Sequence, residues 1–171
     1  MLKLKILITG GSGLIGSHLL GFLRQKNFQL MTLGKKKENT FQVDLTKKKE
    51  VRKFFNNNKF DYILHCAAHV PQFKKKNLNK DWIKNHNMLV NIADYTKAKI
   101  IFFSSIKVYD SFSRIGYEFP IYKKKNITSY QTSKICSENY ILKNRKNSTI
   151  IRLPSVFGKK VKSGLIYKVI N

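Results

Sequence analysis

The sequence is short of acidic residues, of cysteine and of long apolar runs. It has 9 Asp and Glu against 34 Lys and Arg, which gives a formal net charge of +25. The two cysteines, Cys66 and Cys136, lack metal-ligand spacing, which argues against a disulfide scaffold and for a reduced, cytoplasmic protein. No run reaches the roughly 18 apolar residues that a membrane-spanning helix needs. The first apolar run is too short for a signal peptide, so we expect a cytoplasmic chain without a membrane partner.

The excess of positive charge has two interpretations. A strongly basic surface can bind nucleic acid or an anionic membrane. Arginine, the better residue for reading phosphates and bases, is however scarce, while lysine and asparagine are abundant. An AT-rich coding sequence would produce that bias. We favour compositional drift and do not expect a nucleic-acid partner, although the charge leaves this alternative open.

Short apolar runs alternate with segments of helical periodicity along the whole chain. The expected strands are 6–8, 28–33, 41–43, 61–65, 99–104 and 148–153, and the expected helices are 14–23, 46–56, 81–97 and 128–143. The strands are continuous apolar runs, which is typical of parallel sheets covered on both faces. We predict one α/β domain over residues 1–171, with a doubly wound parallel sheet of about six strands and helices on both faces.

A glycine-rich turn, residues 9–16, joins the first expected strand to the first helix. Gly10 can make the tight turn, Gly13 lets a pyrophosphate approach the backbone, and Gly16 lets the helix pack close to the strand. The N-terminus of the helix offers free N–H groups and the positive end of its dipole to an anion. A glycine pattern between a strand and a helix predicts a dinucleotide-binding site.

A second constellation follows the fifth strand. Ser105 comes at the end of that strand, where open α/β sheets bind ligands. Tyr130 and Lys134 are four residues apart and therefore lie on one face of the next helix. A phenol is a poor base at neutral pH, but a nearby cation favours its ionised form and lets it exchange a proton with a substrate. Tyr-x-x-x-Lys alone is weak evidence; after a glycine turn and a strand-end serine it is strong.

Taken in chain order, these motifs resemble the extended short-chain dehydrogenase/reductase family, in its NAD(P)-dependent epimerase/dehydratase group acting on nucleotide sugars. The resemblance covers nearly the whole chain. It implies a Rossmann-type fold, a nucleotide-sugar substrate and a homodimer formed through 81–97 and 128–143. It also implies that Tyr130 moves the proton, Ser105 holds the substrate oxygen, and Lys134 binds the nicotinamide ribose and tunes the tyrosine.

The resemblance further implies a set of cofactor contacts. The pair 44–45 resembles the segment that contacts adenine, the segment 65–68 resembles one that lines the cofactor, and 152–158 resembles one beside the nicotinamide. No metal is expected. The cofactor-binding set is Gly10, Ser12, Gly13, Leu14, Ile15, Gly16, Lys35, Asp44, Leu45, His65, Ala67, Ala68, Asn87, Tyr130, Lys134, Pro154 and Val156.

Two features depart from the family pattern. Gly34 stands where NAD-preferring members carry an acid, and three lysines follow it before Glu38. We therefore expect NADP or NAD as cofactor, with NADP slightly favoured. The chain also ends 13 residues after Gly158, so we expect the C-terminal substrate domain to be absent.

Three functional hypotheses remain at this level. The leading one is an NAD(P)-dependent epimerase, dehydratase or reductase, or the catalytic half of one; the sequence does not choose among these reactions. The second is a dinucleotide-binding module without turnover, with anionic partners such as nucleic acid. The third is a truncated remnant of a longer enzyme.

Overall fold

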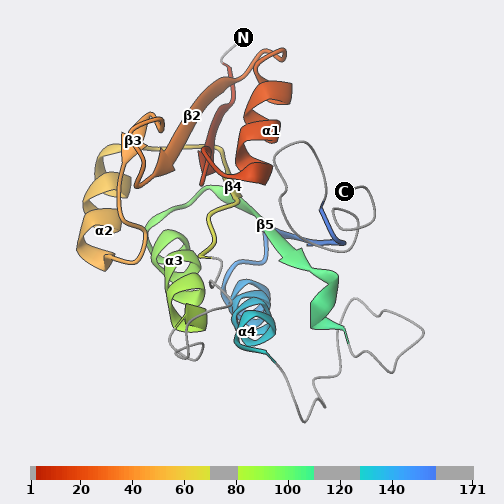
Figure 1. Ribbon diagram of the computed structural model, residues 1–171. Coiled ribbons are helices and arrows are strands. Elements are labelled where there is room, and N and C mark those ends of the chain that lie inside the picture. The colour runs from red at the N-terminus through yellow and green to blue at the C-terminus, as the bar shows by residue number, and fades with distance from the viewer. Residues whose placement is uncertain (1–2, 70–80, 110–127, 157–171) are drawn as a thin grey trace.

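The computed structural model describes residues 3–69, 81–109 and 128–156, which fold around one parallel sheet (Figure 1). The strands are β1 (Lys5–Thr9), β2 (Gln29–Gly34), β3 (Phe41–Gln42), β4 (Tyr62–His65), β5 (Lys99–Ser105) and β6 (Thr149–Leu153). The helices are α1 (Leu14–Leu23), α2 (Lys48–Asn57), α3 (Asp81–Tyr95) and α4 (Ser129–Asn144), with a short 3₁₀ helix, η2 (Ile106–Val108), after β5.

The strand order is β3-β2-β1-β4-β5-β6, and every neighbouring pair is parallel. The chain builds outward from β1 to β3, then returns to the other side of β1 and builds outward again. In the register Thr9 stands opposite both Leu33 and His65. The predicted doubly wound sheet is confirmed. The reversal of strand order lies at the carboxyl ends of β1 and β4, where sheets of this type bind ligands.

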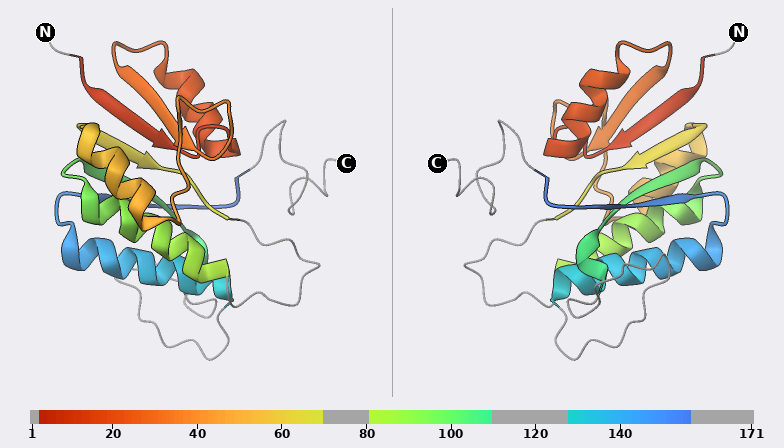
Figure 2. Two further views of the ribbon diagram at one scale, coloured as in Figure 1. Left: turned by 90° about the vertical axis from the view of Figure 1, so that its left-hand side faces the viewer. Right: turned by 90° about the vertical axis from the view of Figure 1, so that its right-hand side faces the viewer.

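The apolar run of β1 is buried on both faces because successive strand residues point to opposite sides of a sheet. Leu7 belongs to the larger apolar core, beneath α2, α3 and α4, whereas Ile6 and Ile8 pack with residues of α1. The views of Figure 2 show α2, α3 and α4 together on one side of the sheet and α1 on the other. Continuous hydrophobicity therefore marks a strand between two helical layers.

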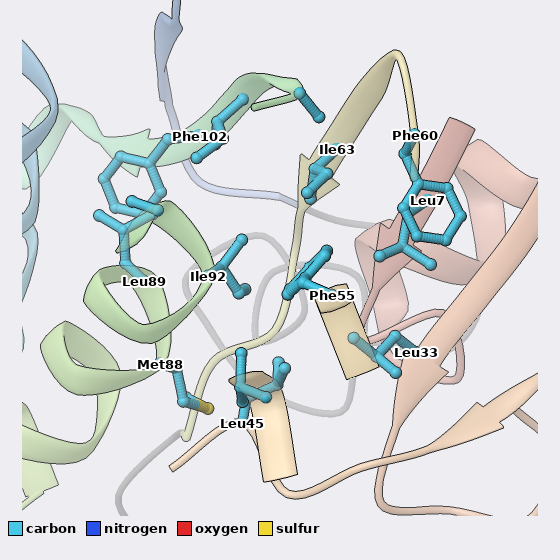
Figure 3. Packing of buried hydrophobic residues seen from close by; sticks show 14 of the residues in the cluster. Leu7, Leu33, Leu45, Phe55, Phe60, Ile63, Met88, Leu89, Ile92 and Phe102 are labelled. Carbon is cyan, nitrogen blue, oxygen red and sulfur yellow. The ribbon is translucent and has the colours of Figure 1, made fainter. Parts of the chain in front are cut away.

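The larger core holds the carboxyl edge of the sheet in place. Phe55 of α2 and Leu89 and Ile92 of α3 are almost completely buried against the strands (Figure 3). Burying a side chain of this size contributes about 1.5–3 kcal/mol. Met88 and Leu45 lie at the margin of this core (Figure 3) and also line the cavity described below. Packing in the core thus fixes the floor of that cavity.

Most strand and helix bounds differ from the expected ones by one or two residues, and three of these differences lie at the end of β2, the start of α2 and the end of α3. The second strand was expected over 28–33, but Gly34 is its last residue and pairs with Gln42. The second helix begins at Lys48 rather than Thr46, because the Thr46 hydroxyl donates to Asp44 Oδ1 (2.7 Å). The third helix ends at Tyr95 rather than at residue 97 because Arg145 donates to backbone carbonyls that include that of Thr96 (2.8 Å).

Within the described residues, no helix is long and apolar enough to cross a bilayer. No group of three or more histidine, cysteine or acidic side chains in those same ranges lies close enough to hold a metal ion.

Candidate functional site

The glycine turn is shaped by close approaches of backbone to backbone. Gly10 has a φ of 68°, and a Cβ there would lie 2.8 Å from the Cα of Ala67. A Cβ on Gly16 would lie 2.3 Å from the carbonyl oxygen of Gly10. Real Cβ atoms do not approach this closely, so both positions need glycine. The turn therefore packs the start of α1 closely against the end of β1, and the end of β1 closely against the residues after β4.

The N-terminus of α1 is open to an anion. Its N-cap is Gly13, which supplies no side-chain cap, and the first turn contains no acidic residue. The first N–H groups of a helix have no partner within the helix, and they carry the positive end of its dipole. A Cβ on Gly13 would lie 3.1 Å from the Gly10 carbonyl oxygen. Gly13 therefore keeps the backbone accessible, as a phosphate-binding turn requires.

A cavity of about 460 Å³ lies in front of this turn, at the carboxyl edge of the sheet. Its volume is in the usual range for small-molecule sites. Seven of the predicted cofactor residues line it: Gly10, Ser12, Gly13, Lys35, Leu45, Ala67 and Ala68. The other lining residues are Gly34, Lys36, Val43, Thr46, Cys66, His69, Lys84 and Met88. Segments from β1, β2, β4 and α3 therefore meet around one space.

Asp44 and Lys35 form an ion pair at one end of the cavity. The Lys35 Nζ to Asp44 Oδ2 distance is 2.8 Å, and the lysine is largely exposed. Asp44 also accepts hydrogen bonds from the Thr46 N–H (3.0 Å) and hydroxyl. Partial burial alone would raise the pKa of Asp44, but the hydrogen bonds from Lys35 and Thr46 outweigh it and lower that pKa. Asp44 is therefore a carboxylate that is fixed by hydrogen bonds from Thr46 and paired with the Lys35 ammonium.

The segment after β4 supplies one wall of the cavity. His65 is fully buried, with its Nδ1 2.8 Å from Thr9 Oγ1, while the Ala67 N–H donates to the same hydroxyl (3.3 Å). Burial, with a smaller contribution from the Lys134 charge, lowers the pKa of His65 to about 3. Burial also raises the pKa of Cys66 to about 12. His65 is therefore neutral at physiological pH and acts as a strand-end anchor rather than a base.

The residues expected to be catalytic lie on β5 and α4. Ser105 is the last residue of β5, and its Oγ accepts a hydrogen bond from the Lys107 N–H (3.2 Å). A capping box between Thr128 and Gln131 begins α4. The Gln131 side chain also donates to the Lys107 carbonyl (2.8 Å). The start of α4, which carries Tyr130, is thereby tied to the segment that follows Ser105.

Lys134 is almost completely buried beside Tyr130. Its Nζ lies 5.9 Å from the Tyr130 ring centroid and 4.7 Å from that of Phe102, and it donates to the Phe103 carbonyl (2.6 Å). Burial lowers the pKa of Lys134 to about 8, although Cys66 and Glu138 act in the opposite direction. Cys66 lines the cavity, whereas Ser105, Tyr130 and Lys134 are not among its lining residues.

The remaining predicted residues do not line the cavity. Leu14 and Ile15 are half-buried and Gly16 is buried in α1. Asn87 on α3 and Pro154 and Val156 after β6 are exposed, and none of the three lines the cavity.

Sequence reasoning missed several residues that support the site. Thr9 anchors His65, and Glu138, four residues after Lys134, pairs with Arg152. Tyr109 accepts a hydrogen bond from Arg152 NH1 (3.1 Å). The i, i+4 relation of Lys134 and Glu138 was the one signal in the sequence that could have pointed to this cluster.

Comparisons with known proteins show which family the chain resembles. The chain matches a family described as the NAD dependent epimerase/dehydratase family over residues 6–171. It is 32% identical over 162 residues to a GDP-6-deoxy-D-talose 4-dehydrogenase of Aggregatibacter actinomycetemcomitans, which covers 91% of this chain and 54% of that protein.

Solved structures give the same result. The UDP-Glc/GlcNAc 4-epimerase of Campylobacter jejuni is similar with a TM-score of 0.72 and 26% identity, over 86% of this chain and 52% of that one. The dTDP-4-dehydrorhamnose reductase of Bacillus anthracis, in complex with NADP, has a TM-score of 0.75 and 22% identity, over 94% and 57%. The latter likeness concerns the fold alone. The chain thus spans about half the length of these three proteins.

Proposed function

The chain belongs to the NAD dependent epimerase/dehydratase family, and from that premise we propose that it is the cofactor-binding, catalytic half of an NAD(P)-dependent enzyme acting on a nucleotide sugar. The carrying observation is the cavity that begins at the glycine turn and reaches Cys66, together with the buried Lys134 ammonium 5.9 Å from the Tyr130 ring centroid. Epimerase, dehydratase and reductase reactions all need hydride transfer at a sugar carbon and a group that exchanges the hydroxyl proton.

The described residues fit a dinucleotide. The uncapped N-terminus of α1 suits the pyrophosphate, and Gly13 leaves room for it. The segment 65–68 forms one wall of the cavity. We assign the adenosine to the part of the cavity near Lys35, Asp44 and Leu45. A bound nicotinamide dinucleotide supplies the carbon that accepts or gives the hydride.

The residues of β5 and α4 supply the proton chemistry. The Ser105 Oγ accepts from the Lys107 N–H, so its own proton can be donated to a substrate oxygen. Tyr130 exchanges the proton of the sugar hydroxyl. The Lys134 ammonium lies 5.9 Å from the centroid of the Tyr130 ring, so a positive charge stands beside the side chain that exchanges the proton. Electrostatic interactions of that ammonium are stronger in its buried surroundings than in water.

The test separates binding from turnover. Titration of the full chain with reduced dinucleotide, followed by nicotinamide fluorescence, is expected to show saturable binding, and its absence would overturn the proposal. Turnover is then assayed with GDP-, dTDP- and UDP-sugars. Tyr130→Phe is expected to keep the binding and lose the turnover, while Tyr95→Phe, on α3, serves as the matched control. Binding without turnover in the wild-type chain would favour the non-catalytic module.

We also propose a modest preference for NADP over NAD. Lys35 and Lys36 line the cavity beside Gly34, so a 2′-phosphate there meets ammonium groups. An exposed pair is worth about 0.2–1 kcal/mol, which gives a preference of a few-fold that shrinks as salt rises. Lys35→Ala should reduce the preference, and Lys37→Ala, outside the cavity lining, should leave it unchanged. Equal affinities, or tighter NAD binding at low salt, would contradict the assignment.

We propose a homodimer as the assembly. Helices α3 and α4 lie side by side in both views (Figures 1 and 2), and each exposes an apolar side chain, Ile83 and Leu142. A partner would cover these residues. Sedimentation at physiological ionic strength is expected to give a dimer, since salt screens the repulsion between basic copies. A monomer at high concentration would count against it.

We propose a cytoplasmic location as well. Cys66 and Cys136 are both free thiols, which agrees with a reducing compartment. Cell fractionation with a tagged chain tests this, and recovery outside the cytoplasmic fraction would overturn it.

A further inference from the structure

A buried ionic cluster lies behind the catalytic residues and takes no direct part in the chemistry proposed above. Glu138 of α4 is fully buried, and Arg152 of β6 is nearly so. Arg152 NH2 donates to Glu138 Oε2 (2.7 Å), and Arg152 Nε lies 3.1 and 3.3 Å from the two carboxylate oxygens. A planar guanidinium that engages a carboxylate with two nitrogens fixes direction as well as distance.

The same guanidinium reaches a third segment. Arg152 NH1 donates to the Tyr109 hydroxyl (3.1 Å), and its Cζ lies 4.8 Å from the Tyr109 ring centroid. Tyr109 ends the 3₁₀ turn that begins directly after Ser105, because its N–H donates to the Ile106 carbonyl (3.1 Å). One side chain therefore holds both α4 and the turn that follows the serine.

The positions of these residues relate the cluster to the site. Glu138 is four residues after Lys134 and eight after Tyr130, so the three side chains lie along one face of α4. Ser105 stands opposite Leu153 in the β5–β6 register, one residue beyond Arg152. A buried ion pair is weak evidence for added stability, and in some proteins such a pair instead fixes one specific arrangement of the chain.

We propose that Glu138 and Arg152, together with Tyr109, are positioning residues that set the relative placement of Ser105, Tyr130 and Lys134. The chemical roles of Ser105, Tyr130 and Lys134 rest on the proposed function. Their placement by the cluster rests on the contacts given above. The Glu138 carboxylate also favours the charged form of Lys134, against the burial that lowers the pKa of that lysine.

Arg145 provides a matched control for a merely stabilising role. It donates to the carbonyls of Thr96 (2.8 Å) and Ala98 (2.9 Å) from the loop that precedes β6. It is thus another partly buried arginine joining α4 to its neighbours, at the opposite, amino edge of the sheet. Arg145→Met should lower the melting temperature without moving the site.

The experiment compares Glu138→Gln and Tyr109→Phe with Arg145→Met in the full chain. Because Glu138→Gln removes the negative charge that the Arg152 guanidinium faces, the double variant Glu138→Met with Arg152→Met removes both charges and keeps the core apolar. The first readout is the dissociation constant for reduced dinucleotide. The second is the set of backbone amide NMR shifts of Ser105 and Tyr130 without cofactor.

The Glu138 variants are expected to weaken dinucleotide binding roughly tenfold or more, by analogy with the effect of removing residues that orient metal ligands. They should also displace the Ser105 and Tyr130 amide signals. Tyr109→Phe should displace the Ser105 signal alone. Arg145→Met should change neither the dissociation constant nor the Ser105 and Tyr130 amide shifts, even if it lowers the melting temperature as much as the Glu138 variants do.

Equal effects of the Glu138 and Arg145 variants, or unmoved Ser105 and Tyr130 signals, would overturn the inference. If the wild-type chain binds no dinucleotide, the proposed function fails, and the amide shifts still decide whether the cluster positions these residues.

Discussion

The buried Lys134 makes the stability of this protein depend on alkaline pH in a predictable direction. Its pKa is about 8 in the folded chain, against an ordinary value of 10.5. Below pH 8 the lysine is charged in both states, and the folded state carries the cost of burying that charge. Between pH 8 and 10.5 the unfolded state binds the proton and the folded state does not, so stability rises with pH in this window.

The magnitude follows from the difference of about 2.5 between the two pKa values. At about 1.4 kcal/mol for each pKa unit, the free energy of unfolding of the wild-type chain rises by roughly 3 kcal/mol across this pH window because of Lys134 alone. Lys134→Met removes the titration. It also removes the hydrogen bond to the Phe103 carbonyl, which costs about 1–3 kcal/mol at every pH.

The assay is urea unfolding at pH 7 and pH 10, followed by far-ultraviolet circular dichroism. The free energy of unfolding of Lys134→Met relative to wild type should fall by about 2–3 kcal/mol between the two pH values. This double difference cancels both the lost hydrogen bond and the titration of the surface lysines. Lys143→Met, exposed on the same helix, is the control and should show no such change. An identical difference at both pH values would refute the argument that the charge of Lys134 is buried at a cost.

Three further outcomes follow from the described contacts. His65→Asn should lose less stability in acid than the wild type. Since His65, with its pKa near 3, stays neutral in the folded state, the free energy of unfolding of the wild type falls by roughly 3 kcal/mol between pH 6.5 and pH 4. Parallel acid-unfolding curves for the two proteins would contradict this. Gly16→Ala should destabilise by about 1–3 kcal/mol because its Cβ meets backbone at 2.3 Å, whereas Gly21→Ala, in open space on α1, should stabilise by about 0.5–1 kcal/mol; thermal melts with equal shifts would argue against the close approach. Thr128→Ala should cost about 1 kcal/mol through loss of the capping box, and an unchanged melting temperature would contradict a role for that cap.

The sequence was sufficient for features that depend on local pattern. Ile6 to Ile8 form an apolar run that only a strand between two helical layers can bury, and β1 has that place. The glycines at 10, 13 and 16 follow a strand and open a helix, and the structure puts them in that turn. Tyr130 and Lys134 share a face of α4 because their spacing is that of one helical turn.

Features that depend on which elements pack together were not predictable in this way. The Lys134 ammonium binds the Phe103 carbonyl, 31 residues away, in addition to facing the expected phenol. Tyr95 ends α3 because Arg145, on a different element, takes the neighbouring carbonyls. The contact between Glu138 and Arg152 could be predicted only if the face of α4 that packs near β6 were already known. In each case a polar side chain contacts a partner that is distant in the sequence, and neighbouring residues do not indicate that partner.

The ion pair between Lys35 and Asp44 has a consequence for ligand affinity. Asp44 is a tethered competitor: its carboxylate occupies the same ammonium that a ligand phosphate would use, at the high effective concentration that attachment to one chain provides. A phosphate must therefore displace an internal anion before it gains the full attraction of Lys35. Added salt weakens the internal contact together with the external one, so these two contributions oppose each other. The binding curve should respond to ionic strength less steeply than the number of lysines around the cavity would indicate.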